Sequence, residues 1–210
     1  MRRPGQRPPL QRIVSLAPSV TQMICQLGAR KQLVGVTRWC QQVAPVAGLP
    51  RLGDCWSADA RKVTALAPDL VIGSVPYKPK VVAGILHHGL TFLAMNPRCL
   101  ADIFNDIQLL GRLLGRQRRA QQLVSRMRTQ LAAIAWRTRG ALTQPAIYCE
   151  AWPKPLLTSP PWVKEIVALA GGRFVPRAAG RRVKATEVLA AKPQVIVLAW
   201  AGKGMRSEPK

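Results

Sequence analysis

The alternation of short β-branched segments with helical segments is the feature that most constrains how this chain folds. Residues 12–16 and 32–37 are apolar and rich in Val and Ile, as buried strands are, and residues 20–27 between them repeat apolar side chains at helical spacing. Ser19 is the expected N-cap of this helix and Gly28 its expected end. A strand, a helix and a strand in this order predict a right-handed crossover and a parallel sheet.

The same alternation continues along most of the chain. Further helices are expected over residues 59–66, 80–88 and 162–170, and further strands over residues 70–73, 91–95, 146–149 and 194–200. The predicted fold class is therefore α/β, with two small Rossmann-like lobes built on parallel sheets.

One segment breaks the alternation. From residue 101 to about 137 there is no proline, and apolar side chains recur every three or four residues between Ile103 and Ile134, apart from one gap of seven residues where Gln117 interrupts. This pattern predicts one long amphipathic helix of roughly 50 Å between the lobes. A break near Gly115, which would give two helices, is the alternative. The predicted domains are a basic tail (1–11), an N-terminal lobe (12–100), the linking helix (101–139) and an incomplete C-terminal lobe (140–210).

An internal repeat supports the two lobes. Residues 63–72 match residues 188–197 at a constant offset, with a helix end, a proline and a buried strand in both copies. A shorter match pairs residues 24–28 with residues 167–171. Two similar lobes are expected to leave a cleft between them, and such clefts are favoured ligand sites.

The chain is strongly basic, with a formal net charge of +23. Arginines recur through residues 101–140 and 173–184 within otherwise apolar, periodic segments, which is typical of solvated helix faces. A protein that binds nucleic acid or an anionic membrane through these arginines is the alternative. Nucleic acid is not expected as a partner, because no zinc pattern and no aromatic-basic strand motif accompanies the charge.

The five cysteines form no C-x-x-C pair and are odd in number, so buried free thiols are expected. A single disulfide, for instance Cys25–Cys40, is the alternative. No apolar run approaches the roughly 20 residues that span a bilayer. Residues 1–10 are basic and proline-rich and lack the apolar stretch of an export signal.

No constellation of residues predicts catalysis. Ser15 and Ser159 lack His-Asp support, no glycine-rich phosphate loop is present, and the nine acidic residues are scattered singly. The protein is therefore not expected to be an enzyme or to hold a cofactor or a metal. The adjacent His87 and His88 could include an axial ligand, but a surface position or a helix C-cap is favoured, because neighbouring histidines face different sides of a helix.

Several ordered motifs resemble the helical-backbone solute-binding proteins of ABC importers, in particular the cobalamin and iron-chelate branch. The resemblance runs from residue 12 to about residue 204. It rests on residues 12–21 (RIVSLAPSVT), 27–29, 33–37, 66–72 (LAPDLVI), 149–152 (CEAW), 161–163, 170–172 and 197–202 (VLAWAG). It implies a monomeric, extracytoplasmic receptor that captures cobalamin between its lobes and hands it to an ABC permease. An iron-siderophore or haem receptor and a cytoplasmic corrinoid carrier are the alternatives.

A corrin is a broad, mostly apolar disc, so it needs large flat side chains and a few polar partners. Ligands of open α/β sheets bind at the carboxyl ends of the strands. Trp39 falls where the cobalamin receptors have a cleft aromatic and is the favoured candidate, while ordinary packing is the alternative for every member of the set. The predicted ligand-binding residues are Trp39, Trp56, Tyr77, Glu150, Trp152, Trp162 and Trp200.

The chain departs from the family pattern in three respects. An export signal is expected at the start and is not evident. Members dock on permease arginines through an acidic residue on each lobe, whereas Arg61 and Thr186 stand at the matching positions, with Glu187 beside the latter. The second lobe is expected to continue for several elements beyond the strand at residues 194–200, which would leave an exposed sheet edge here.

Overall fold

The computed structural model describes residues 10–200, and these residues fold into two compact units. Unit 1 comprises residues 10–96 and 104–124 of the described chain, and unit 2 comprises residues 97–103 and 125–200. Each unit is described below by itself. The mixed α/β fold that the sequence predicts is confirmed, whereas the predicted domain boundaries at residues 100 and 139 stay predictions.

Unit 1 is built on a five-stranded parallel sheet in the order β3-β2-β1-β4-β5. The strands are β1 (Ile13–Ser15), β2 (Leu33–Thr37), β3 (Arg51–Leu52), β4 (Leu70–Ser74) and β5 (Phe92–Met95). β1 lies at the centre and its three residues are fully buried, which explains why the sequence there is apolar without alternation.

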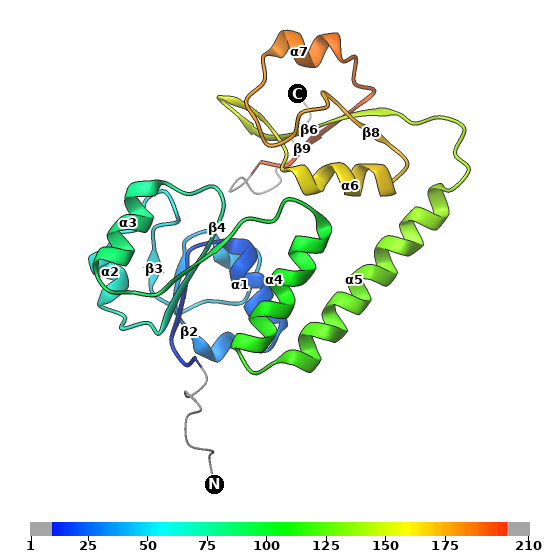
Figure 1. The fold of residues 1–210 in the computed structure, drawn as a ribbon. Helices are drawn as coiled ribbons and strands as arrows, with labels where there is room; N and C mark the ends of the chain where they lie inside the picture. The colour runs from blue at the N-terminus through cyan, green and yellow to red at the C-terminus, as the bar shows by residue number, and fades with distance from the viewer. Residues whose placement is uncertain (1–9, 201–210) are drawn as a thin grey trace. The chain divides into compact units, whose positions relative to one another are not determined.

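Helices cover both faces of this sheet. α2 (Ala60–Thr64) and α3 (Pro79–His87) lie on one face, while α1 (Pro18–Gln26) and most of α4 (Leu100–Leu113) lie on the other (Figure 1). The α2–α3 face buries an apolar cluster around Val14, Val71 and Ile85. Two short 3₁₀ turns, Arg30–Gln32 and Cys40–Gln42, precede and follow β2.

The start of α1 differs from the prediction in one detail. Ala17 occupies the N-cap and contributes no side-chain hydrogen bond, and Pro18 is the first helical residue. Ser19 therefore lies inside the helix, and the prediction that it caps the helix is wrong. Proline suits the first position because its missing N–H would have no partner there.

The single linking helix predicted for residues 101–139 is also wrong. α4 ends at Leu113, and α5 (Gln117–Thr138) begins after a short turn. Gly115 adopts a left-handed conformation with φ +65°, which ends α4 in the way that glycine often ends helices. The gap in the apolar spacing at Gln117 was the sequence signal for this break.

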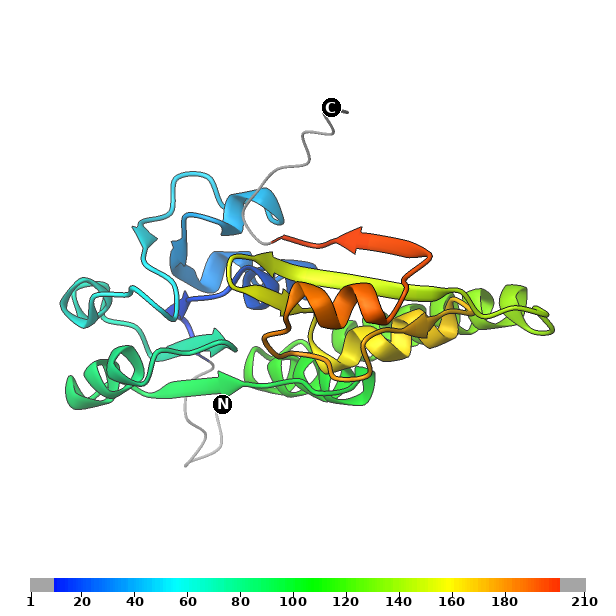
Figure 2. The same cartoon turned by 90° about the horizontal axis from the view of Figure 1, so that it is seen from above.

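Unit 2 contains a smaller mixed sheet around the long strand β6 (Ala146–Pro153). β7 (Leu156–Thr158) pairs with β6 in antiparallel fashion, whereas β8 (Arg173–Phe174) and β9 (Val195–Leu198) pair with it in parallel. The helices α6 (Pro161–Leu169) and α7 (Ala185–Ala190) complete the unit. β9 lies at the edge of this sheet (red-orange in Figure 2), and all four of its residues are exposed.

The internal repeat of the sequence is visible in the backbone. Ala67 and Lys192 occupy equivalent repeat positions, between a helix and a strand, and both have an unusual positive φ, 43° and 44° respectively. In both copies the side chain two residues later accepts a hydrogen bond from a backbone N–H next to the central strand: Asp69 from Arg12 (2.9 Å) and Gln194 from Ala146 (2.9 Å). The two units therefore share the same connection between a helix and the strand that follows it.

Candidate functional site

A pocket of about 450 Å³ lies in unit 1 at the carboxyl ends of two neighbouring strands. β2 and β3 run in parallel, so the loops that follow them leave the sheet side by side. The pocket is lined by Thr37, Arg38, Trp39, Arg51, Leu52, Gly53, Asp54 and Ser57.

A buried polar network holds the turn that carries Trp39. The backbone N–H of Trp39 donates to the hydroxyl of Thr37 at 3.2 Å, and that hydroxyl lies 3.2 Å from the Cys40 thiol. Thr21 of α1 contacts the same thiol at 3.0 Å and donates to Ser15 at 2.8 Å. Because these groups are buried and mutually satisfied, the first residues after β2 are fixed in place.

The opposite wall of the pocket depends on a glycine. A Cβ atom on Gly53 would lie 2.5 Å from the carbonyl oxygen of Ser57 and 2.6 Å from the backbone nitrogen of Ala58. Contacts this short between a Cβ and backbone atoms do not occur in stable structures, so only glycine allows the loop to turn back here. Asp54 closes the same loop by accepting hydrogen bonds from the Trp56 N–H (3.0 Å) and the Ser57 hydroxyl (2.9 Å).

Trp39 is half-buried and is one of the residues that line the pocket. The guanidinium carbon of Arg38 lies 4.4 Å from the centroid of this ring, a cation–π distance. Across the pocket, Arg51 donates to the side-chain amide of Gln41 at 2.7 Å. The pocket therefore combines a flat aromatic face with two cationic groups, an arrangement that binds and orients a ligand but offers no nucleophile paired with a base.

Trp56 and Tyr77, the other two candidates in unit 1, do not line this pocket. Trp56 is 53 % exposed on the Asp54 loop. Tyr77 packs edge-on against Phe92, with ring centroids 6.1 Å apart, and its hydroxyl donates to the carbonyl oxygen of Met95. Burial, followed by the nearby Cys55, raises the pKa of Tyr77 to about 12. The structure thus gives Tyr77 a packing role, and its assignment to a ligand stays a prediction.

In unit 2 the structure brings together Glu150, in the middle of β6, and Trp200, which follows the carboxyl end of β9. Glu150 is only 7 % exposed, and its two oxygens accept hydrogen bonds from Tyr148 (3.0 Å) and from the Trp200 indole N–H (2.8 Å). Burial, with the hydrogen bond to Glu150 and the negative charge of that residue, raises the pKa of Tyr148. The Glu150 carboxylate is therefore committed to two internal donors.

Trp152 and Trp162 lie near the same end of the sheet. Trp152 is an exposed residue of β6, and its indole N–H donates to the carbonyl oxygen of Lys154 at 3.0 Å. Trp162 is the second residue of α6, and the Ser159 N–H, just before this helix, donates to the Cys149 carbonyl at 2.8 Å. The segment before α6 is therefore held beside β6, which leaves Trp152 and Trp162 as open candidates.

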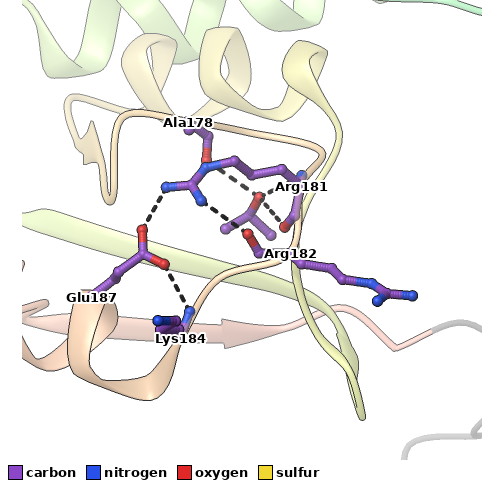
Figure 3. Close-up of polar contacts among 6 residues, drawn as sticks. Ala178, Arg181, Arg182, Lys184 and Glu187 are labelled. Carbon is purple, nitrogen blue, oxygen red and sulfur yellow. Dashed lines mark hydrogen bonds and ion pairs between the residues drawn. The ribbon is translucent and has the colours of Figure 1, made fainter.

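The predicted docking residues lie at the starts of the two repeat helices. Arg61 in α2 and Thr186 in α7 are both exposed. Glu187 forms an ion pair with Arg181 (2.6 Å) and also accepts a hydrogen bond from the Lys184 N–H at 2.9 Å, which caps α7 (Figure 3). These two contacts lower the pKa of Glu187, so its carboxylate stays charged but is already partnered.

The cysteines and histidines show no sign of a metal site. All five cysteines are free, so the Cys25–Cys40 disulfide that the sequence left open is not formed. His88 is the C-cap of α3, and its Nδ1 lies 2.9 Å from the Gly84 carbonyl oxygen, as the favoured interpretation of the histidines requires. Within residues 10–200 no cluster of three His, Cys, Asp or Glu side chains suits a metal ion, and no helix has the length and apolarity needed to cross a membrane.

The sequence predicted Trp39 as a ligand-binding residue, which stays a prediction, and did not single out the two arginines that line the same pocket. Arg38 had a signal, since it directly precedes Trp39 at a strand end. Arg51 had none, because β3 is only two residues long and its pairing with β2 cannot be recognised from a pattern.

Comparisons with known proteins agree with this architecture. The sequence pattern of the Periplasmic binding protein family matches residues 13–208. A vitamin B12-binding protein of Vibrio cholerae is 27 % identical over 195 residues, which cover 90 % of this chain and 70 % of that protein. A vitamin B12-binding protein of Yersinia pestis is 26 % identical over 197 residues, with 90 % and 69 % coverage.

Solved structures show the same fold at lower identity. A periplasmic haem-binding protein of Pseudomonas aeruginosa superposes with a TM-score of 0.80 at 24 % identity, covering 94 % of this chain and 74 % of that one. The periplasmic vitamin B12-binding protein of Vibrio cholerae gives a TM-score of 0.74 at 23 % identity, with 90 % and 76 % coverage. The family consists of solute-binding proteins rather than enzymes. With a family match over nearly its whole length and this α/β architecture, the chain belongs to the Periplasmic binding protein family and is a substrate-binding protein of the ABC importer type.

Proposed function

We propose that this protein captures cobalamin or a closely related corrinoid outside the cytoplasm and delivers it to the permease of an ABC importer. The observation that carries the proposal is the pocket beside Trp39, which presents an aromatic face at the carboxyl ends of β2 and β3. The curated relatives at 26–27 % identity are vitamin B12-binding proteins, which supports a corrinoid as the ligand. A cleft shared by the two lobes stays a prediction.

The mechanism requires binding and release without covalent chemistry. The edge of the flat corrin ring packs against the part of the Trp39 indole that Arg38 does not cover, and the two arginines of the pocket supply polar contacts beside it. Hydrogen bonds among Ser15, Thr21 and Cys40 fix the turn after β2. Ligand binding therefore costs little conformational entropy in this turn. Such preorganisation favours tight capture of a scarce ligand.

Delivery to a permease would need a docking surface on each lobe. Because the Glu187 carboxylate already pairs with Arg181, docking through Glu187 requires a permease cation to share or displace Arg181. Arg61 cannot act as an acidic docking residue. We therefore expect any contact of α2 with a permease to involve the partner's carboxylates rather than its arginines.

Titration with cyanocobalamin tests the ligand proposal. Calorimetry on the full chain should show saturable binding, and the melting temperature should rise with ligand concentration, since a ligand that binds only the folded state stabilises it. The Trp39→Ala variant should bind about tenfold more weakly or worse, as expected for a buried aromatic anchor that contributes at least about 1.4 kcal/mol.

Trp136→Ala is the matched control. Trp136 lies on α5, is 69 % exposed, and does not line the Trp39 pocket. Its removal should leave the affinity unchanged. Absence of any heat or melting shift with cyanocobalamin would overturn the proposal, and equal losses in both variants would remove Trp39 from the site.

A further inference from the structure

Most acidic side chains of the described chain are occupied by backbone N–H groups or neutral donors instead of arginines. A carboxylate that accepts such hydrogen bonds closes a loop or caps a helix instead of forming a direct pair with an arginine, although it keeps its charge. The carboxylates with such partners are those of Asp54, Asp59, Asp69, Asp102, Glu150 and Glu165.

This distribution leaves the pocket beside Trp39 with two cations that have no acidic partner. Within residues 10–200, neither Arg38 nor Arg51 forms an ion pair with a carboxylate. Arg38 rests on the Trp39 ring, and Arg51 donates to a neutral amide. Asp54 also lines the pocket and keeps its negative charge, but its Oδ1 accepts hydrogen bonds from its own loop, and two arginines against one carboxylate leave the pocket with a net positive charge.

We propose that Arg38 and Arg51 form an anion-binding subsite that selects a flat macrocycle carrying a phosphate or carboxylate group. This inference rests on the proposed function and adds a chemical requirement to it. The guanidinium group binds phosphate and carboxylate oxygens through parallel N–H donors, and the adjacent indole accepts a flat ring. The pocket therefore offers both a site for an acidic group and an aromatic contact for a flat ring.

The size of the pocket indicates which part of the ligand it takes. Ligand sites range from roughly 300 to 1,000 Å³, and a volume of about 450 Å³ lies in the lower half of that range. The subsite therefore suits the acidic edge of a macrocycle and not the entire ring. In cobalamin the acidic group is the phosphodiester of the nucleotide loop, and in haem it is the pair of propionates.

The test compares ligands that differ in the acidic group. Cyanocobalamin is paired with dicyanocobinamide, which lacks the nucleotide and its phosphate, and haem is paired with its dimethyl ester, which lacks free carboxylates. Affinities are measured by calorimetry for the wild type and for the double variant Arg38→Gln with Arg51→Gln. The control is Arg61→Gln with Lys62→Gln, which removes the same charge from exposed positions on α2 of the same unit.

If the subsite exists, the loss of affinity requires both the pocket arginines and the acidic group of the ligand. The pocket variant should lose about tenfold in affinity for cyanocobalamin or haem, whichever binds, and this loss should shrink as salt is added. For dicyanocobinamide or haem dimethyl ester, which lack the acidic group, the affinity of the pocket variant should stay within about twofold of the wild type. The control variant should bind all ligands as the wild type does. The ligand pair that shows this dependence identifies phosphate or carboxylate as the group recognised.

Other results separate the two proposals. If the wild type binds corrinoid or haem and the pocket variant loses nothing, or loses equally for both members of a pair, the subsite is wrong while the proposed function stands. If the wild type binds none of the four ligands, the proposed function fails. Inorganic pyrophosphate then decides the subsite: binding that the pocket variant abolishes and the control retains supports it, and equal or no binding overturns it.

Discussion

At the scale of single residues, the two tyrosines offer the clearest readout of local environment. The chain has only Tyr77 and Tyr148, so tyrosinate absorbance reports on these two groups alone. Burial is the main reason that the pKa of Tyr77 rises to about 12 and that the pKa of Tyr148 rises as well. We expect both to ionise above the ordinary value of about 10 in the folded protein, and near that value in denaturant.

Stability should follow the same titration. A folded-state pKa above the unfolded one means that the folded protein retains protons that the unfolded chain releases. The contribution of the tyrosines to the free energy of unfolding is therefore fully present below about pH 10 and is lost as the pH rises toward about 12, where the raised pKa of Cys55, about 11, acts in the same direction. Unfolding midpoints measured across that range check this. Glu150→Gln removes the negative charge beside Tyr148 and should lower its pKa. A folded protein in which either tyrosine titrates at about pH 10 would contradict the burial argument.

The sequence predicts which residues follow strand ends, and the structure places one of them, Trp39, in a pocket, while its role in ligand binding stays a prediction. Trp39 follows a strand end, and strand ends in a parallel sheet meet at one edge, so its place in a pocket wall was foreseeable. Tyr77 follows β4 and Glu150 lies within β6, and the polar groups of both bond to internal partners. The direction of a side chain at a strand end depends on tertiary neighbours, which a single sequence does not display.

At the scale of elements, the packing of α4 on α5 depends on one small residue. A Cβ atom on Gly111 of α4 would lie 2.4 Å from the Cβ of Ala120 in α5. Gly111→Ala should therefore destabilise the protein by about 1–3 kcal/mol, although alanine on its own favours a helix by about 1 kcal/mol. Denaturant unfolding measures the difference.

The exchange of the two residues is the control for this prediction. Gly111→Ala combined with Ala120→Gly restores one small residue at the contact, so the pair should be less destabilised than the sum of the two single variants. Additive losses would show that the contact between the helices is not what Gly111 protects.

The repeat helices and strands show what sequence patterns resolve and what they miss. The matched segments 63–72 and 188–197 form the same helix, left-handed residue and strand, and they were identified from sequence because both are local patterns. The burial of the two strands, which depends on their tertiary surroundings, was not predicted from sequence. β4 is central and covered on both faces, whereas β9 is exposed. The break at Gly115 was underestimated because the apolar spacing resumes after the single gap at Gln117, so the two helices resemble one interrupted helix.

This difference yields a paired prediction for equivalent positions. Val71 in β4 is 0 % exposed, and its repeat partner Ile196 in β9 is 59 % exposed. Val71→Ala should cost about 2 kcal/mol through lost burial and a cavity, whereas Ile196→Ala should cost less than about 1 kcal/mol despite deleting more atoms. Denaturant unfolding of both variants compares them directly. A larger loss for Ile196→Ala would mean that something covers β9 in solution.

At the scale of the whole molecule, the excess of positive charge should lower the stability of the folded state. The formal net charge is +23, because 32 lysines and arginines face only nine acidic residues, so the exposed arginines repel one another with few carboxylates to offset them. Raising the ionic strength from 0.01 to 0.15 M shortens the screening length from about 30 to about 8 Å. The melting temperature should therefore rise over this range of sodium chloride.

Charge removal on α5 separates this repulsion from other effects of salt. Arg118 and Arg126 are exposed on α5, and α5 carries no acidic residue. Replacing both by Gln should raise the melting temperature at 0.01 M salt and reduce its salt dependence, while the two proteins should converge at high salt, where screening is complete over a few ångströms. A wild-type melting temperature that falls with added salt would show that attractive pairs outweigh the repulsion. In that case the arginine-rich surface would be compensated by contacts that the hydrogen-bond pattern does not reveal.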